Sequence, residues 1–477
     1  MSSFAKEAVS GRNRTVSGIA ALAALAGLLF GFDTGVISGA QLYITKDFHA
    51  STSVQSWYVG ALLLGACVGA ALAGYLADRF SRKLTIIGAG VVYVGAALWS
   101  GLAGGSGELI SARAVLGLAV GAASFVGPLY ISEHVPPKLR GGTVSFNQFM
   151  ITSGIFLAYI VDYAFKDVAN NWRWMLALGA LPGILLTAGM LLVPHTPRWL
   201  LEADREDDAR DVLSRTHGAR GVNKEVKEIQ GVLASERRAG LRELFAADVR
   251  PMLIVGLGLA FFQQAVGVNT VVYYAPTILK YTGLSANQSV TEALSVGITN
   301  VVFTVLAIAL LDRVGRRLLL ITGTAGLTVA LVALGVFFHS STLQAHASWI
   351  AVVALVVFIA SFAIGLGPVF WLMISEVFPL RVRSQAMAIC TIVNWAVNFV
   401  ISFYFLTLVA SIGRPATFWI YAGFGVVATA FFAIRVPETK GRSLEQIERE
   451  LGAEQQPTRS TTSRATTRRG RRSPSNA

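Results

Sequence analysis

Asp33 is a lone carboxylate in the apolar stretch LAGLLFGFDTGVISGA, residues 25–40. A charge at the centre of a bilayer costs roughly 2.5–3.5 kcal/mol even on the gentler insertion scales, and such residues commonly carry protons or ions. The apolar stretch 109–131 contains one cation, Arg113, whose long side chain can reach Asp33 if the two stretches adjoin. We predict that Asp33 binds a proton and that Arg113 tunes its charge. The alternative is a static salt bridge.

Side-chain amides inside apolar stretches form a second group. A neutral ligand rich in hydroxyl groups, such as a sugar, needs amide donors and acceptors beside a flat apolar surface. Trp371 and Trp395 supply such surfaces. A single amide is more simply explained by a hydrogen bond between helices, but seven amides spread along the chain favour a shared polar cavity. They are Gln148, Gln263, Gln264, Asn269, Asn300, Asn394 and Asn398.

Long apolar runs must position these residues. The 477-residue chain is 54% hydrophobic and 14% charged, with a mean hydropathy of +0.58, and a helix that crosses a bilayer needs about 20 apolar residues. We therefore predict an all-α integral membrane protein with twelve transmembrane helices. The runs are 17–44, 57–77, 84–104, 109–131, 146–164, 173–193, 251–278, 293–311, 318–338, 348–375, 385–410 and 416–436.

The net charge of +13 is concentrated between these runs and in the tails, as in the positive-inside pattern, so nucleic-acid binding is not indicated. Both termini are predicted to be cytoplasmic. Cys67 and Cys390 lie inside apolar runs, and the six His residues lack ligand spacing, so we expect no disulfide, metal or cofactor. The cations that follow the second, fourth, eighth and tenth runs are Arg79, Arg82, Lys83, Lys138, Arg140, Arg313, Arg316, Arg317, Arg381 and Arg383.

The chain repeats itself. ISEHVPPKLR, from Ile131, recurs as ISEVFPLRVR, from Ile374, and VPHTPRWL recurs more loosely as VPETKGRSL. Two halves of six spans each are therefore predicted, as in transporters with parallel repeats. The predicted segments are an N-terminal tail, 1–16, a first bundle, 17–194, a cytoplasmic linker with short amphipathic helices, 195–250, a second bundle, 251–436, and a C-terminal segment, 437–477. That segment is expected to be disordered after about residue 452, with arginines that can touch anionic headgroups.

Charged residues recur on the short loops and helix ends of one side. They can form ion pairs that latch this side shut, with topology alone as the alternative. The expected latch residues are Asp78, Arg79, Arg82, Glu133 and Arg140 in the first half, and Asp312, Arg313, Arg316, Glu376 and Arg383 in the second.

The seventh run is expected to be broken. At about 100° per residue, Asn269 lies some 120° from Gln263 on an ideal helix, so the two cannot face one point unless the helix unwinds. Gly267 and Pro276 make a break plausible, and Gly365, Gly367 and Pro368 do the same for the tenth run.

These residues resemble the sugar porters of the major facilitator superfamily over about residues 17–450. The resemblance is carried by GYLADRFSRK (74–83), PLYISEHVPPKLRG (128–141), PHTPRWL (194–200), QQAVGVNTVVYYAP (263–276), DRVGRR (312–317), GPVFWLMISEVFP (367–379) and PETKGRSLEQIE (437–448). It implies the major facilitator fold and an acid at Asp33 that serves proton coupling. It also implies a gate at Tyr273 and Tyr274, with Gly267 and Pro368 loosening their helices. The implied sugar-binding residues are Phe30, Gln148, Gln263, Gln264, Asn269, Asn300, Trp371, Asn394 and Trp395.

Three positions depart from the family pattern. Ile155 stands where some bacterial members carry a second glutamine, and Asn394 where some carry glutamine, which tilts the expected substrate toward glucose or another hexose. Ser81 stands where the loop motif usually has glycine.

The expected function is inward transport of a monosaccharide with a proton, by a monomer in a bacterial inner membrane, and not an enzymatic reaction. The alternatives are an uncoupled facilitator on the same fold and, more remotely, a membrane sugar sensor that does not transport.

Overall fold

The computed structural model describes residues 11–135, 140–217, 221–236, 241–379, 382–442 and 446. Within these residues every regular element is helical, and twelve helical stretches of 20 to 31 residues are long and apolar enough to cross a membrane. Each predicted apolar run coincides with one of them. The largest difference is at the eighth, which begins at Ala286 rather than near 293 because Ser285 and Gln288 form a capping box ahead of the apolar residues.

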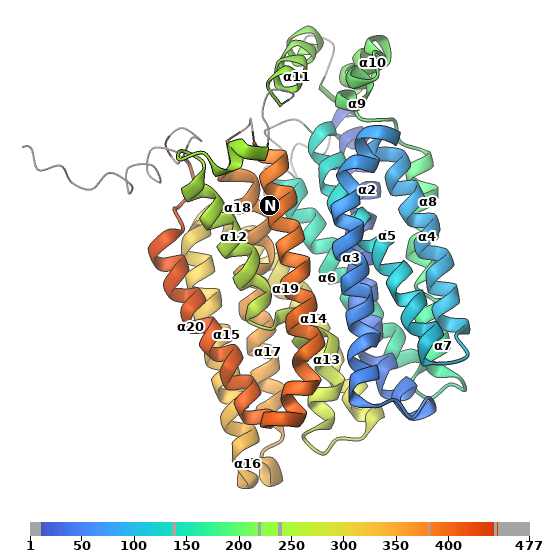
Figure 1. The fold of residues 1–477 in the computed structure, drawn as a ribbon, viewed down its shortest axis with the longest axis vertical. Coiled ribbons are helices and arrows are strands. Elements are labelled where there is room, and N and C mark those ends of the chain that lie inside the picture. Colours follow the sequence, from blue (N-terminus) through green and yellow to red (C-terminus); the bar gives the residue numbers. More distant parts are fainter. Residues whose placement is uncertain are drawn as a thin grey trace, which may run out of the picture.

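The first six spans form one group of helices, here called the N half (Figure 1). They are α2 (Gly11–Asp47), α3 (Thr52–Phe80), α4 (Arg82–Leu102), α5 (Ser106–His134), α6 (Arg140–Phe165) and a sixth span made of α7 (Asn171–Ala177) and α8 (Ala180–Leu191). The break between α7 and α8 was not predicted. Pro182 accounts for it, because proline lacks the N–H that would continue the helical hydrogen bonds across Leu178.

The last six spans form the C half. They are α12 (Arg250–Ala265) with α13 (Val268–Lys280), α14 (Ala286–Val314), α15 (Arg316–His339), α17 (Trp349–Ile364) with α18 (Leu366–Glu376), α19 (Arg383–Ile412) and α20 (Arg414–Arg435), and the short α16 (Ser341–His346) follows α15. The predicted interruptions of the seventh and tenth spans are present, at Gly267 and Gly365. Gly267 adopts a φ of 79°, which a residue with a side chain rarely tolerates.

Small residues bring the helices of the N half into close contact. Gly65 and Gly69 of α3 face the backbone of α5, and Gly117 and Gly121 of α5 face the backbone of α3, so that a Cβ atom at any of them would collide with the neighbouring chain. Close backbone approach of this kind is how helices associate where lipid removes the hydrophobic driving force.

The segment between the halves contains α9 (Pro197–Glu202), α10 (Glu206–His217), α11 (Val222–Glu236) and the 3-10 helix η3 (Leu241–Phe245). Helices α9–α11 lie together at one end of the bundle, at the top of Figure 1, and we call this end the linker face. The predicted tail positions 1–10 and 447–477, with Lys138, Arg381 and the side chains of Arg140 and Asp312, lie outside the described residues.

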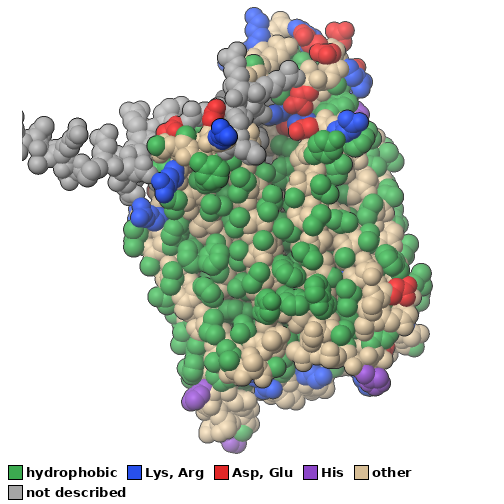
Figure 2. Space-filling view, in the orientation of Figure 1, with side chains coloured by type: hydrophobic (Ala, Val, Ile, Leu, Met, Phe, Trp, Pro, Cys, Tyr) green, Lys and Arg blue, Asp and Glu red, His purple; other side chains and the backbone are tan. Residues whose placement is uncertain are grey.

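The flank of the bundle is apolar. Figure 2 shows hydrophobic side chains over the middle of the molecule and charged side chains gathered toward its two ends. Large hydrophobic side chains exposed along the spans include Leu72, Val91, Leu185, Val329 and Val427. An apolar belt of this extent is suited to lipid rather than water.

Candidate functional site

Asp33 and Arg113 form an ion pair inside the N half. Asp33 lies at the middle of its span, and its Oδ1 atom accepts a hydrogen bond of 2.5 Å from Nη1 of Arg113 in α5. Nε of Arg113 donates to the Tyr58 carbonyl of α3 at 3.0 Å. The two side chains are 2% and 0% exposed. The carboxylate and the guanidinium, far apart in sequence, are therefore directly paired, with Asp33 near the middle of its span.

The pair keeps unused hydrogen-bonding capacity. Oδ2 of Asp33 and Nη2 of Arg113 have no hydrogen-bond partner within the described part of the chain. Buried polar atoms are normally satisfied, so unsatisfied ones need an explanation such as a functional role. The hydroxyl group of Tyr273 in α13 interacts electrostatically with both Asp33 and Arg113. A residue of the C half therefore lies near this ion pair.

Gln263, Gln264 and Asn394 form one amide cluster in the C half. Nδ2 of Asn394 donates to Oε1 of Gln263 at 2.6 Å and to the Ala260 carbonyl at 3.1 Å. Oδ1 of Asn394 accepts from Nε2 of Gln264 at 3.1 Å. Nε2 of Gln263 donates to the Leu366 carbonyl at 3.1 Å, beside the break in the tenth span. Three of the predicted sugar-binding amides thus lie within hydrogen-bonding distance of one another.

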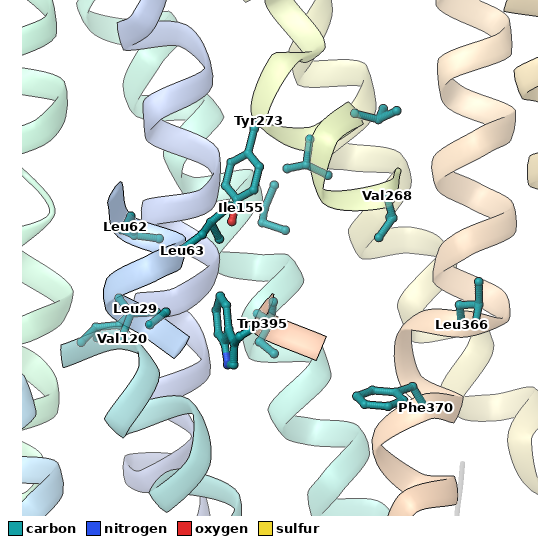
Figure 3. Packing of buried hydrophobic residues seen from close by; sticks show 14 of the residues in the cluster. Leu29, Leu62, Leu63, Val120, Ile155, Val268, Tyr273, Leu366, Phe370 and Trp395 are labelled. Carbon is teal, nitrogen blue, oxygen red and sulfur yellow. The ribbon is translucent and has the colours of Figure 1, made fainter. Parts of the chain in front are cut away.

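Aromatic side chains from both halves meet next to this cluster. The rings of Phe30 and Trp395 pack edge to face at 5.1 Å between centroids. Trp395 belongs to the same packed cluster as Leu29 and Ile155 of the N half (Figure 3). The two halves therefore share one apolar wall beside the amides.

A small cavity opens between the halves on the side of these aromatics. Phe30 and Trp371 line it, and an unpredicted amide, Asn147, lines it too, with an Oδ1 atom that lacks a partner among the described residues. Its neighbour Gln148 is buried, and the Nε2 atom of Gln148 lies beside Gly367 of the broken tenth span. The other lining residues are Gly27, Ser124, Pro128 and Ile151.

Asn269 and Asn300 are not hydrogen-bonded to the amide cluster within the described residues. Asn269 is half-buried at the start of α13. Asn300 of α14 is buried, with its Oδ1 atom unpaired in this part of the chain. Asn398 accepts a hydrogen bond of 3.0 Å from Ser402. Among the described residues, no hydrogen bond therefore connects these three amides to the compact cluster around Asn394.

The halves are joined by hydrogen bonds at the end opposite the linker face. Tyr159 of α6 donates to the Val272 carbonyl of α13 at 2.9 Å. Tyr43 of α2 donates to Asn287 of α14 at 2.9 Å. Tyr273 and Tyr274 of α13, two residues of the predicted gate, are fully buried in this region. Pro368, a third residue of the predicted gate, lies near the start of α18. This end of the molecule is therefore closed.

An ion cluster at the linker face ties α4 to its neighbours. The buried Arg82 contacts Asp78 at 3.1 Å, Glu133 at 3.2 Å and Glu202 at 3.0 Å. Arg198 of α9 adds a contact of 3.7 Å to Glu133. Arg198 and Glu202 were not predicted as members of this cluster. Arg198 lies inside the motif PHTPRWL, and Glu202 lies two residues after its end.

The C half carries a matching cluster. Arg316 contacts Glu376 at 3.3 Å. Glu376 also accepts a hydrogen bond of 2.6 Å from the hydroxyl of Thr439. Glu438 accepts the backbone N–H groups of Arg316 and Arg317 at the start of α15, at 2.9 and 3.1 Å. Partial burial alone would raise the pKa of Glu438. The pKa is nevertheless lowered below its ordinary value, because the carboxylate accepts backbone hydrogen bonds from Lys440, Arg316 and Arg317 and lies near the charge of Arg316. The Glu438–Thr439 segment was another unpredicted part of this site.

Arg82 with Glu133 and Arg316 with Glu376 are ion pairs between expected latch residues, and their latching role stays a prediction. Each one joins helices of a single half, and among the described side chains no ion pair links the two halves. Arg79 and Arg313 are exposed, and Arg383 donates to the Phe378 carbonyl at 3.0 Å. The reason is geometric: the helix-end acids lie directly over the first turn of α4 or α15 in their own half.

Twelve spans in two six-helix groups, with polar residues where the groups meet, define a membrane transporter rather than an enzyme. The chain matches the family described as "Sugar (and other) transporter" over residues 19–451. It belongs to this sugar transporter family of the major facilitator superfamily.

Two relatives and two solved structures illustrate the similarity. The chain is 42% identical to the metabolite transport protein YwtG of Bacillus subtilis (strain 168), over 90% of this chain and 93% of the relative. It is 38% identical to the galactose-proton symporter of Escherichia coli (strain K12), with the same coverage. The proton:xylose symporter XylE bound to 6-bromo-6-deoxy-D-glucose superposes with a TM-score of 0.80 at 32% identity, covering 92% of this chain and 100% of that one. A partially occluded inward-open conformation of XylE from E. coli also gives 0.80, at 31% identity, covering 90% and 100%.

Proposed function

We propose that this protein imports a monosaccharide, glucose or another hexose, together with a proton by alternating access. The buried pair of Asp33 and Arg113 carries the coupling part of this proposal. A carboxylate in a membrane span is retained where it is functional, and its single cation can hold it charged in one conformation and release it in another. Arabinose- and galactose-proton symporters among the relatives, at 34–38% identity, support proton coupling.

The sugar is proposed to bind between the amide cluster and the aromatic wall. Gln263, Gln264 and Asn394 offer donors and acceptors from the C half, and Phe30, Trp371 and Trp395 offer flat surfaces beside them. A ring of hydroxyls needs this combination. Gln148, Asn269 and Asn300 are proposed to complete the site as the halves move.

The hexose preference rests on fewer observations. Ile155 is buried and apolar where some family members carry glutamine. One relative, 38% identical, is named a glucose transporter, and another, 41% identical, is named a D-xylose transporter. The level of sequence identity therefore does not distinguish a hexose from a pentose as the substrate.

The orientation is proposed from charge. The linker face carries Arg82, Arg198 and Arg316 in ion clusters, and Lys/Arg-rich loops favour the cytoplasm. The closed end with Tyr273 and Tyr274 is then extracellular, so that the conformation described here is closed to the outside. We further propose that the protein is a monomer with both termini in the cytoplasm of a bacterium, where the Arg-rich tail can touch anionic lipid.

Accumulation of glucose in energised membrane vesicles tests this function, with wild type beside Asp33→Asn. We expect wild type to concentrate glucose and the variant only to equilibrate it. A protonophore should reduce wild type to the behaviour of the variant. If both proteins equilibrate glucose alike, the protein is a facilitator and the carboxylate is structural.

Two controls complete this experiment. If neither protein takes up glucose, xylose, galactose and inositol are tested in the same vesicles. Uptake by purified protein in liposomes distinguishes a transporter from a sugar sensor, because a sensor binds sugar without moving it.

A further inference from the structure

Asp162 is a second buried carboxyl group, and the proposed mechanism does not use it. It lies in α6, near the end opposite the linker face, and is 1% exposed. Its Oδ2 atom accepts a hydrogen bond of 3.1 Å from the backbone N–H of Gly39 in α2. Its Oδ1 atom has no partner in the described part of the chain. One backbone donor is therefore its whole hydrogen-bonding environment there.

Among the described residues no cation pairs with Asp162, whereas Asp33 is paired with Arg113. Lys166, the nearest cation along the chain, pairs with Asp167 at 2.5 Å beyond the end of α6. Tyr43 of α2 and Tyr159 of α6 are the titratable groups that face Asp162, and both are neutral donors at ordinary pH. Neither can compensate a negative charge on Asp162.

The described charged side chains of the other packed helices are engaged elsewhere or exposed. Arg173 of α7 donates to the carbonyls of Gly101 and Ala103. Arg113 of α5 is held by Asp33. Glu292 of α14 is exposed, and Glu376 of α18 belongs to the cluster at the linker face. An isolated carboxylate buried in this way takes up a proton rather than remain charged.

The position of Asp162 connects it to the closed end. Gly39 lies six residues beyond Asp33 in α2, about 9 Å further along the helix. Tyr43, one turn beyond Gly39, donates to Asn287 of the C half, and Asn287 donates to Asp167 at 2.5 Å. The contact that closes this end thus lies next to the carboxyl group, and its opening would admit water.

We propose that Asp162 is a second proton-binding site, distinct from Asp33, that is protonated while the two halves are in contact at this end. When the halves separate there, the hydrated carboxyl group releases its proton to the adjacent water and becomes a carboxylate. Protonation of Asp162 therefore favours the closed arrangement, and a rising pH on that side favours the open one.

Infrared spectroscopy of the purified full-length protein tests this site without any sugar. A negative result would therefore overturn the proposal for Asp162 without bearing on the proposed transport function. We expect wild type at neutral pH to show the carbonyl band of a protonated carboxylic acid. Asp162→Asn should lose this band, and the control Glu292→Gln should keep it. Absence of a band that depends on Asp162 would overturn the proposal.

A pH titration of the same band tests the link to the closed end. Asn287→Ala removes the contact with Tyr43, so we expect the band to disappear at a pH about one unit lower than in wild type, a tenfold change in proton affinity. An unchanged midpoint would overturn the link. If Asp162→Asn fails to fold, Gly39→Ala is used instead, because its Cβ would collide with the carboxyl group and should shift the frequency of the band. An unshifted band would then count against the assignment.

Discussion

Arg113 joins three of the first four spans. Its Nη1 atom contacts Asp33 of α2 at 2.5 Å, and its Nε atom donates to the Tyr58 carbonyl of α3 at 3.0 Å. A buried ion pair is favourable only where further hydrogen bonds support it. The conformation seen here therefore holds α2, α3 and α5 through one guanidinium, and any motion that separates them changes the environment of Asp33.

Arg113→Lys should weaken proton coupling more than sugar exchange. Lysine keeps the charge but lacks the planar fork that reaches two acceptors at once. Loss of one charged hydrogen bond predicts a decrease of about tenfold in uptake driven by a proton gradient. Exchange of labelled sugar without a gradient should be retained. Equal losses in both assays would indicate a structural role for the arginine.

Asn394→Ala should weaken sugar binding through the amide cluster. It removes one hydrogen bond from Gln263 and one from Gln264, each worth about 0.5–1.5 kcal/mol, and leaves them their contacts with the Leu366 carbonyl and with each other. We expect the affinity for glucose to fall at least tenfold, measured by the fluorescence of Trp371 and Trp395. The matched variant Asn394→Gln keeps an amide and should bind more tightly than the alanine variant. If Asn394→Ala binds glucose with wild-type affinity, the amide cluster is not part of the sugar-binding site.

Arg82→Ala should destabilise the protein strongly. It leaves Glu133, whose side chain is 6% exposed, without its nearest cation. Removing one partner of a buried ion pair typically costs about 3–5 kcal/mol. The control is Arg79→Ala, three residues earlier at the end of α3 but exposed. Thermal unfolding in detergent should show a lower midpoint for the first variant only, and equal midpoints would contradict the role of the cluster.

Glu438→Gln should destabilise the protein at neutral pH but not in acid. Burial raises the pKa of Glu438, but the backbone donors of Lys440, Arg316 and Arg317 outweigh it, so that the folded pKa is lowered. A group with a lowered folded pKa stabilises the protein above its unfolded value, about 4.3, and loses this contribution as the pH falls through the folded value. The unfolding midpoints of wild type and variant should therefore approach each other as the pH falls from the unfolded value through the lower folded one. A constant difference across pH would mean that the ionised form is not the one stabilised.

Gly267→Ala should impair the broken seventh span. The residue has a φ of 79°, and a Cβ atom there would lie 2.7 Å from the ring of Tyr421. Strain of this kind costs about 1–3 kcal/mol. The control Gly423→Ala has open space around its Cβ position. We expect a lower unfolding midpoint and slower uptake for the first variant, and unaffected values for both would show that the break is not required.

The sequence by itself determined the spans, because bilayer thickness imposes a length and a polarity that each run displays. It also indicated interruptions near Gly267 in the seventh span and near Gly365 in the tenth, since glycine and proline weaken helical hydrogen bonding there. The motifs identified the family, because several short patterns occur in order along nearly the whole chain.

Only the tertiary structure decided which groups meet. Burial and partners depend on how helices distant in sequence pack. Asp33 and Asp162 are both acids in apolar runs, yet one lies against Arg113 and the other against a single backbone N–H. In the same way, Glu202 and Glu438 reach helix ends that no local pattern assigns to them. Side-chain type sets what an interaction can be, and the packing of helices sets whether it is made.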